Sequence, residues 1–415
     1  MKISGGIPLN GVIRAQGAKN AALPVMAACL LLRGGTLDLD NVPELNDINT
    51  MIDLLCALGV DVAKNNNGHV KFNVPDEINF EAPESLVRKM RASSVVLGPL
   101  LARCGRVVLP LPGGCSIGSR PIDLHLKGLK QMGAEIEIKN GVVYASARGK
   151  LRGRRIYLDF PSVGATENLM MAAALATGET IIENIAREPE IDNLADTLRC
   201  LGVPVELEGA GGVRIKGIDE AKSGSCRVIP DRIEACTYIM AGIMTGGEIT
   251  VNDIVPAHIY STLAKLEEAG ARFKVRKNSV IVYPVKRLKA VSFKTMPFPG
   301  FPTDSQPQMT ATLSIANGVS TVEESVFQAR FLYAQELNRM GADIEISRDM
   351  AIIRGVKKLH GAKVKATDLR AGAALIIAGL AAEGETSVED MVHVWRGYDA
   401  IDEKLRTLGA KVELA

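Results

Sequence analysis

A reactive thiol is the first chemistry that this sequence offers. Cys115 follows Pro112, Gly113 and Gly114, and Arg120 lies five positions further along. Adjacent glycines can take positive φ and favour a mobile loop. A nearby guanidinium favours thiolate over thiol and attracts anions. A buried structural cysteine is the alternative, because most free cysteines are of that kind, but these neighbours favour the reactive thiol.

Cations stand just before several apolar segments. Lys19 and Asn20 precede the apolar run 21–32. A lysine is unfavourable at a helix N-terminus unless an anion is bound there, and an exposed, solvated lysine is the alternative. Three arginines are placed in a similar way: Arg91 and Arg370 precede later apolar runs, and Arg396 follows the last of these runs.

Two further helix starts carry polar side chains. Asp304 precedes the fifth apolar run, either as a helix cap or as a carboxylate of the site. Ser162 and Thr166 lie on either side of Gly164 at the start of the third run. Capping is the common role of such residues, but the backbone N–H groups there also suit a diphosphate. Several cations, one thiol and one carboxylate together favour a small, highly charged anionic substrate.

The elements that must position these residues repeat six times. A glycine between an apolar residue and Ala or Val recurs every 68 to 74 residues, at Gly59, Gly133, Gly202, Gly270, Gly341 and Gly409. A second glycine ends an Ala-rich run and opens a short strand, at Gly35, Gly105, Gly178, Gly247, Gly318 and Gly384. Two independent markers that agree six times indicate a true repeat.

Each unit is expected to contain one helix that is apolar on nearly all sides, one amphipathic helix and short strands. Residues 165–177 are an example of the apolar helix, and residues 191–201 are an example of the amphipathic helix. The pattern predicts an α/β fold of six repeated α/β units, three per lobe, with apolar helices at the centre of each lobe and sheets and outer helices around them. We expect lobe one at residues 20–228, with the Cys115 loop, and lobe two at 1–19 plus 229–415. A cleft between two such lobes is a usual place for a ligand.

Composition excludes several classes of protein. The 415 residues carry a net charge of only +2, which gives no support for binding nucleic acid through bulk charge. No apolar run is long enough to span a bilayer, and the first residues lack the apolar core of a signal peptide. Seven cysteines without a Cys-x-x-Cys pair, and five scattered histidines, do not predict zinc ligation or a disulfide framework. We expect a cytoplasmic protein without metal, cofactor or membrane insertion.

Four motifs together closely resemble the family of bacterial UDP-N-acetylglucosamine 1-carboxyvinyltransferases, enolpyruvyl transferases of the EPSP synthase superfamily. They are residues 17–24, 112–121, 187–191 and 301–304, and the likeness extends from Ile3 to Val412. The resemblance implies the family's fold, a two-lobed inside-out α/β barrel of six repeated α/β units, three per lobe. It also implies transfer of the enolpyruvyl group of phosphoenolpyruvate to the 3′-hydroxyl of UDP-N-acetylglucosamine, with release of phosphate, at the first committed step of peptidoglycan precursor synthesis.

The resemblance implies two proton-transfer groups. Cys115 would donate a proton to the methylene carbon of phosphoenolpyruvate, and fosfomycin would alkylate the same thiol. Asp304 would accept the proton of the sugar hydroxyl. Cations near Cys115 lower the pKa of its thiol, whereas arriving substrate charge raises it, so we expect that thiol's titration to change when substrates bind.

The resemblance also implies the binding residues. Lys19 and Arg120 would hold the phosphate of phosphoenolpyruvate, while Arg396, with Arg370 nearby, would bind its carboxylate. The residues expected to contact the intermediate or the sugar nucleotide are Asn20, Arg91, Arg120, Pro121, Ile122, Asp123, Leu124, Ser162, Val163, Gly164 and Val326.

Some positions depart from the family's common pattern. Trp395 stands where aspartate is more usual, Phe160 where some members have lysine, and Gln328-Ala329 where Glu-Asn is more frequent. The sister enzymes that act on shikimate 3-phosphate share the six units but lack a comparable Pro-Gly-Gly-Cys loop. A paralogue that binds the sugar nucleotide without catalysis is a third possibility. RNA 3′-terminal phosphate cyclases share a related repeat, but the near-neutral charge of this chain and the absence of a matching histidine motif argue against that function.

Overall fold

Two compact units make up the described chain. The computed structural model describes residues 1–65, 67–113, 122–209, 211–327 and 329–414. Unit 1 contains Met1–Gln16 and the chain from Pro230 onward, and unit 2 contains the described chain from Gly17 to Ile229. Each unit has its own apolar core. The boundary expected from the sequence groups Lys19 with residues 229–415, whereas the compact unit that contains Lys19 here is unit 2.

Unit 2 surrounds buried helices with three sheets. Its most buried helices are α1 (Lys19–Ala27), α4 (Leu97–Cys104) and α6 (Val163–Ala174). The other helices are α2 (Asn46–Ala57), α3 (Glu84–Val87), α5 (Asp123–Gln131) and α7 (Pro189–Cys200). The sheets, in strand order, are β13 (Gly224–Arg227), β3 (Thr36–Asp40), β5 (Val70–Asn73), β4 (Asp61–Lys64); β6 (Arg106–Pro110), β8 (Val142–Ala147), β7 (Ala134–Lys139); and β11 (Val205–Glu208), β12 (Gly212–Lys216), β10 (Glu179–Glu183), β9 (Arg155–Tyr157).

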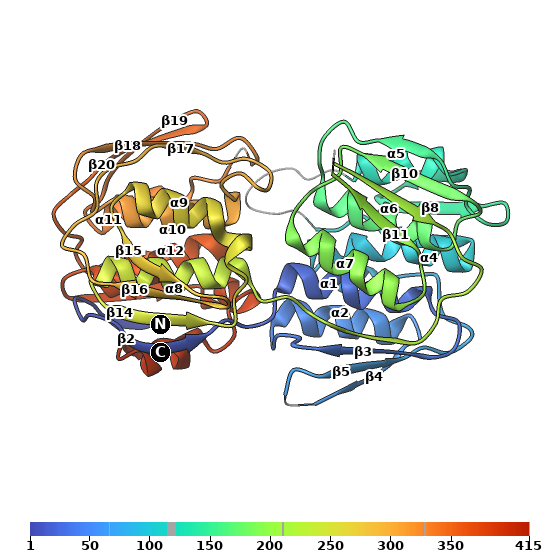
Figure 1. Ribbon diagram of the computed structural model, residues 1–415, viewed down its shortest axis with the longest axis horizontal. Coiled ribbons are helices and arrows are strands. Elements are labelled where there is room, and N and C mark those ends of the chain that lie inside the picture. Colours follow the sequence, from blue (N-terminus) through green and yellow to red (C-terminus); the bar gives the residue numbers. More distant parts are fainter. Residues whose placement is uncertain (66, 114–121, 210, 328, 415) are drawn as a thin grey trace. The chain divides into compact units, whose positions relative to one another are not determined.

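Unit 1 repeats this plan, with α8 (Arg232–Thr245), α10 (Gln306–Leu313) and α12 (Leu369–Ala381) at its centre (Figure 1). The amphipathic helices are α9 (Tyr260–Glu268), α11 (Tyr333–Arg339) and α13 (Ile401–Thr407). The sheets are β15 (Arg272–Val275), β16 (Ser279–Tyr283), β14 (Glu248–Asn252), β2 (Asn10–Arg14); β17 (Phe293–Lys294), β18 (Val319–Glu323), β20 (Met350–Arg354), β19 (Asp343–Ser347); and β21 (Lys363–Lys365), β22 (Glu385–Glu389), β1 (Lys2–Ser4), β23 (Lys411–Glu413).

All six sheets share one pattern of strand pairing. In β14, for example, one edge pairs parallel with β2 and the other pairs antiparallel with β16. The sheet of β6 has three strands, but a parallel bridge between Glu81 and Val108 occupies the place of the fourth. The predicted α/β fold with six repeated units is therefore confirmed.

The first glycine marker has a conformational cause. All six of its glycines have φ between 88° and 102°, at the point where an amphipathic helix ends and a strand begins. A side chain at this φ would clash with the backbone, so glycine is favoured at the turn. The second marker follows the same rule at five positions, but in the fourth unit Gly246, and not Gly247, has positive φ.

Two of the buried helices are shorter than the apolar runs suggest. The run 21–32 forms α1 and then a 3₁₀ turn, η1 (Ala28–Leu31). Before α4 the chain forms a second 3₁₀ segment, η2 (Arg91–Val96). Hydrophobic periodicity marks burial but does not separate α from 3₁₀ geometry.

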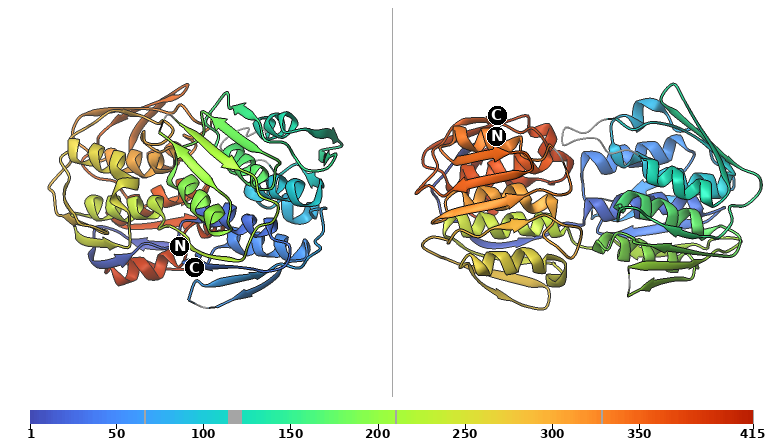
Figure 2. Two further views of the ribbon diagram at one scale, coloured as in Figure 1. Left: turned by 45° about the vertical axis from the view of Figure 1, so that its right-hand side comes forward. Right: turned by 90° about the horizontal axis from the view of Figure 1, so that it is seen from above.

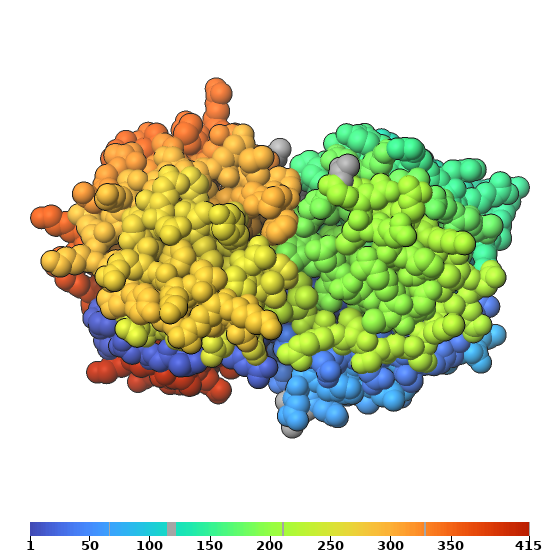
Figure 3. All heavy atoms as spheres, viewed as in Figure 1, coloured from blue at the N-terminus to red at the C-terminus, as the bar shows by residue number. Residues whose placement is uncertain are grey.

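The two ends of the chain meet in one sheet. Strand β1 lies between β22 and β23 and pairs antiparallel with both. The N and C labels lie side by side in both views of Figure 2. Figure 3 shows the N-terminal segment, in blue, against the C-terminal residues, in red, on the surface of unit 1. No helix among the described residues has the length and apolar character needed to cross a membrane.

Candidate active site

In unit 1, Asp304 lies between two buried arginines. It belongs to the 3₁₀ turn η4 (Thr303–Ser305), directly before α10. One carboxylate oxygen accepts from Arg330 Nη2 and the other from Arg370 Nη2, each at 3.0 Å. The side chains of Arg330 and Arg370 are 2% and 5% exposed, and that of Asp304 is 26% exposed. Two guanidinium groups thus fix the orientation of a carboxylate that solvent still reaches and favour its ionised form.

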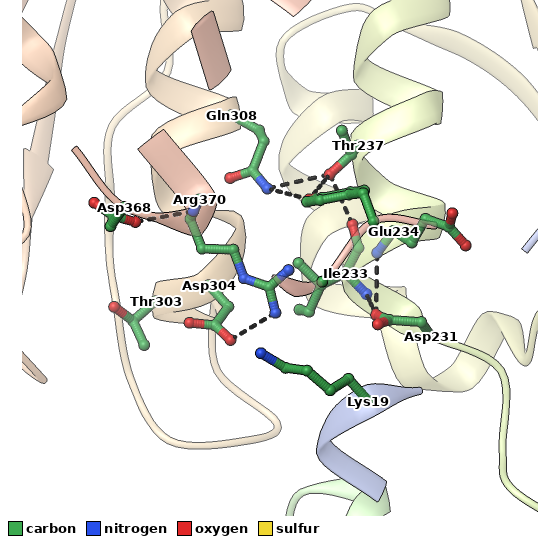
Figure 4. Close-up of polar contacts among 12 residues, drawn as sticks. Lys19, Asp231, Ile233, Glu234, Thr237, Thr303, Asp304, Gln308, Asp368 and Arg370 are labelled. Atoms are coloured by element: carbon green, nitrogen blue, oxygen red, sulfur yellow. Dashed lines mark hydrogen bonds and ion pairs between the residues drawn. The ribbon is translucent and has the colours of Figure 1, made fainter. Parts of the chain in front are cut away.

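Arg370 has a second donor nitrogen, Nη1, that is suited to bind an anionic ligand. Asp368 caps α12 by accepting from the N–H groups of Arg370 and Ala371, which holds Arg370 in the first turn (Figure 4). Burial, the largest single influence, lowers the pKa of Arg370, but Asp304, Tyr398 and Asp231 together outweigh that effect and raise it. Its buried Nη1 finds no hydrogen-bond partner among the described residues. An unsatisfied buried donor is unfavourable, so this atom is suited to a ligand oxygen.

Arg330 and Glu324 organise the segments on either side of Asp304. Arg330 also donates to the carbonyl of Thr303, through Nε at 3.3 Å and Nη2 at 3.1 Å. Glu324, only 4% exposed, accepts from the Thr303 hydroxyl at 3.0 Å and from the N–H of Val326 at 2.8 Å. The position predicted for sugar contact, Val326, is therefore tied to the turn that carries Asp304.

Arg396 ends the 3₁₀ segment η5 (Met391–Arg396) and is half-buried. This segment packs against α12, which carries Arg370. Tyr398 lies 5.9 Å below the Arg370 guanidinium, and its hydroxyl contacts Thr237 at 2.8 Å. Trp395 is 40% exposed. The chain around Arg396 is thus supported from the core of unit 1.

In unit 2, Lys19 pairs with a buried carboxylate. It is the first residue of α1, and its side chain is 11% exposed. Its Nζ contacts Asp47 Oδ2 at 3.0 Å, and the Asp47 side chain is 7% exposed. The solvated lysine considered above is therefore not what is observed. Asn20 follows in the first turn and is half-buried. An ammonium group has three donors, so Lys19 can bind an anion while it keeps Asp47.

A neutral histidine lies among the residues predicted to bind the diphosphate. His125, in α5 and 4% exposed, contacts Asn168 Nδ2 through Nδ1 at 2.8 Å. Burial, with a smaller contribution from the charge of Arg91, lowers the pKa of His125 to about 3. Since Asn168 donates to Nδ1, the proton of the neutral ring is assigned to Nε2.

The start of α6 lies against this histidine. Ser162 caps α6 by accepting from the N–H of Ala165, and Thr166 donates to the Ser162 carbonyl at 2.8 Å. The capping role is confirmed for Ser162, whereas Thr166 lies inside the first turn and does not cap the helix. A Cβ added to Gly164 would lie 3.3 Å from His125 Nε2. Residues at the starts of two helices therefore come together around His125, namely Ile122, Asp123 and Leu124 of α5 and Ser162, Val163 and Gly164 of α6.

Three predicted site residues lie outside the described residues: Cys115, Arg120 and Pro121. The described part of the chain contains no group of three His, Cys, Asp or Glu side chains that could hold a metal ion. Several residues of these clusters received no role from the sequence, among them Arg330 and His125. Arg330 follows the pair Gln328-Ala329 and His125 follows the motif 112–121 by four positions, but neither shows its contacts in the sequence.

Comparisons with known proteins identify the family of the chain. Residues 3–405 match the EPSP synthase (3-phosphoshikimate 1-carboxyvinyltransferase) family. A protein named UDP-N-acetylglucosamine 1-carboxyvinyltransferase 1, from Caldanaerobacter subterraneus subsp. tengcongensis, is 50% identical over 98% of this chain and 97% of its own length. The protein named UDP-N-acetylglucosamine 1-carboxyvinyltransferase 2, from Carboxydothermus hydrogenoformans, is 51% identical over 99% and 98%.

Solved structures share the fold. The enolpyruvyl transferase NikO from Streptomyces tendae superposes with a TM-score of 0.90 at 25% identity, over 99% of this chain and 97% of that one. An EPSP synthase from Acinetobacter baumannii gives a TM-score of 0.77 at 18% identity, over 98% and 97%, which shows the fold alone. With half of its residues identical to full-length relatives, the chain belongs to the EPSP synthase family, among the UDP-N-acetylglucosamine 1-carboxyvinyltransferases.

Proposed function

We propose that this enzyme transfers the enolpyruvyl group of phosphoenolpyruvate to the 3′-hydroxyl of UDP-N-acetylglucosamine, and that Cys115, Asp304, Lys19 and Arg396 carry the chemistry. Phosphate is released, and the product is a precursor of peptidoglycan. Full-length relatives at about half identity support the reaction. The observation that carries the residue assignment is the carboxylate of Asp304, held by two arginines beside an unsatisfied Arg370 donor.

The reaction proceeds by addition and then elimination. In the addition, Cys115 gives its proton to the methylene carbon of phosphoenolpyruvate, and the sugar oxygen bonds to the neighbouring carbon. Asp304 takes the proton of that hydroxyl. In the elimination, the new methyl group returns a proton to the Cys115 thiolate and the carbon–oxygen bond to phosphate breaks, while the proton held by Asp304 leaves with the phosphate. The central carbon passes through a cationic, oxocarbenium-like state, which the negative charge of Asp304 stabilises.

Cations bind the acidic groups of phosphoenolpyruvate. Lys19 and Arg120 hold its phosphate. Arg396 binds its carboxylate, with Arg370 nearby, whose Nη1 can donate a hydrogen bond to such an oxygen. Asn20 contacts the tetrahedral intermediate. Because guanidinium groups bind carboxylates through paired hydrogen bonds, the arginines also fix the orientation of the substrate.

The nucleotide half of the second substrate binds in unit 2. The proposed contacts are the starts of α5 and α6, which meet around His125, together with Arg91, Arg120 and Pro121. Helix N-termini supply N–H donors to phosphate groups. Val326 contacts the sugar. The same enzyme is proposed to be cytoplasmic, which its six described cysteines, all free, support.

Phosphate release tests the proposal. The purified enzyme is mixed with phosphoenolpyruvate and UDP-N-acetylglucosamine, and phosphate is measured with both substrates and with each alone. We expect release only with both, and none when shikimate 3-phosphate replaces the sugar nucleotide. Release with shikimate 3-phosphate, or no release at all, would refute the activity.

Substitutions at Cys115 test the thiol. Cys115→Ser should lower the rate about 100-fold or more, because a hydroxyl is a much weaker proton donor. Cys115→Asp should keep activity, since a carboxyl group can still deliver a proton. It should also resist fosfomycin, which alkylates the wild-type thiol. A Cys115→Asp enzyme that fosfomycin inactivates as fast as wild type would contradict the assignment.

A further inference from the structure

Glu234 is a fully buried carboxylate that the mechanism above does not use. It lies in the first turn of α8, after the N-cap residue Asp231, where a negative charge is favoured by the helix dipole. Its side chain is 0% exposed. Burial raises the pKa of Glu234, while the nearby Lys404 ammonium and a backbone N–H oppose that change. A buried carboxylate is unfavourable unless it is paired and hydrogen-bonded, so the partners of Glu234 define its role.

Both oxygens of Glu234 have partners from distant parts of the sequence. Oε1 accepts from Lys404 Nζ at 2.7 Å, and Oε2 accepts from the backbone N–H of Gln16 at 2.7 Å. The Gln16 carbonyl in turn accepts from the N–H of Asp231 at 2.8 Å. The backbone of Gln16 is thereby held to the start of α8 on both sides. Gln16 is also the last residue of unit 1 before the chain enters unit 2.

The side chain of Gln16 continues the network to the segment after Arg396. Its Nε2 donates to the carbonyl of Gly397 at 3.1 Å, and its Oε1 accepts from the N–H of Asp399 at 3.1 Å. Lys404 also reaches Gln16 Oε1, at 3.4 Å, which closes a ring. The ring consists of Glu234, Gln16, Lys404 and the segment 397–399.

We propose that Glu234 is a positioning residue that fixes the Arg396 segment to Gln16, in the segment after β2 by which the chain leaves unit 1. The proposal rests on the proposed role of Arg396 in binding the carboxylate of phosphoenolpyruvate. Hydrogen-bonded groups in a buried ring reinforce one another, so loss of one member loosens the rest. A displacement of the orienting arginine by a fraction of an ångström then weakens its contact with the substrate.

Glu234→Gln tests this role, because it keeps the size of the side chain and removes its charge. The amide can accept from Gln16 or from Lys404 but not from both with full strength, and Lys404 loses its counter-charge. We expect the KM for phosphoenolpyruvate to rise about tenfold, as an orienting group moves. The KM for UDP-N-acetylglucosamine should stay within about twofold, since its proposed contacts lie elsewhere.

Asp402→Asn is the matched control. Asp402 is 6% exposed and pairs with Arg406 at 2.8 Å, on the same helix α13 as Lys404, but lies outside the ring. The Asp402→Asn variant should have a lower melting temperature than wild type and an unchanged KM for each substrate. If Glu234→Gln behaves like this control, or raises both KM values equally, Glu234 is structural only and the proposal fails.

Gln16→Ala gives a second, milder variant should Glu234→Gln fold poorly. It removes the contacts to Gly397 and Asp399 but leaves the backbone of residue 16 in place. We expect the same selective rise in KM. The double variant should show less than the product of the two effects, because both act through one ring. Independent effects would refute the ring. A wild-type enzyme that releases no phosphate would instead refute the proposed function.

Discussion

Replacement of Asp304 by Asn separates two roles that the structure gives to one carboxylate. The variant keeps the shape of the side chain and one acceptor oxygen. It also places an NH₂ group against one of the two guanidinium groups that the carboxylate now contacts at 3.0 Å. We therefore expect a loss of stability and a separate, larger loss of catalysis.

The stability loss follows from burial. Breaking a fully buried ion pair costs about 3–5 kcal/mol, whereas an exposed pair contributes about 0–1 kcal/mol. Arg330 and Arg370 are almost fully buried, but the carboxylate is 26% exposed, so water can partly replace it. We expect Asp304→Asn to lower the free energy of unfolding by about 1–3 kcal/mol.

The catalytic loss is expected to be larger. Removal of the proton acceptor should lower kcat by about 10²–10⁴, equivalent to about 3–5 kcal/mol in the barrier. The KM for phosphoenolpyruvate should change less than about threefold, because both arginines keep their charge. Steady-state phosphate release and urea unfolding measure the two quantities on the same preparation.

Two results would refute this reasoning. A kcat within about fivefold of wild type would show that Asp304 is not the proton acceptor. A large rise in the KM for phosphoenolpyruvate, with kcat unchanged, would show that Asp304 orients the arginines for binding and takes no proton. Arg330→Met serves as the control, since it unbalances the same cluster but leaves the carboxylate in place.

Three further predictions concern the helices of unit 2. Gly164→Ala places a Cβ about 3.2 Å from the His125 ring. It should raise the KM for UDP-N-acetylglucosamine about tenfold and leave the KM for phosphoenolpyruvate unchanged. Equal changes in both KM values would argue against a nucleotide site there. His125 has a pKa of about 3 in the folded protein, below its unfolded value, so its contribution to stability is present above about pH 6.5 and is lost as the pH falls toward 3. In calorimetry, His125→Gln should therefore lose less stability than wild type over that range. Parallel curves of stability against pH for the two proteins would contradict the assignment. Burial, with the charges of Glu190 and Glu188, raises the pKa of Glu167, which makes its ionised form unfavourable at neutral pH. Glu167→Gln should therefore have a higher melting temperature than wild type at pH 7 but not at pH 4. The opposite order would show that ionised Glu167 has a stabilising partner.

The sequence predicts the repeated parts of this fold well, because their causes are local. A glycine at positive φ ends each amphipathic helix, and the spacing of six such glycines is visible without a structure. Apolar runs likewise mark the buried helices. The division of the run 21–32 into α1 and η1 was not predicted, since both geometries bury the same side chains.

The sequence names candidate site residues but does not give their contacts. Asp304 and Arg370 meet across 66 positions, and Lys19 and Asp47 across 28. Such pairs depend on how the units pack, and no local spacing encodes them. Arg330 shows the same difficulty: one arginine in a loop looks like any surface cation until its burial is known. The family motifs compensated for this by marking positions, not geometry.

The placement of β1 has a consequence for synthesis on the ribosome. The described residues of unit 2 all lie between Gly17 and Ile229, so this unit can fold once that part of the chain has emerged. Strand β1, in contrast, pairs with β22 and with β23, which are made last. At about 5–20 residues per second, the first strand waits roughly 20–80 s for its partners. During that interval its edges are open to other nascent chains, which makes completion of unit 1 the step that a chaperone would protect.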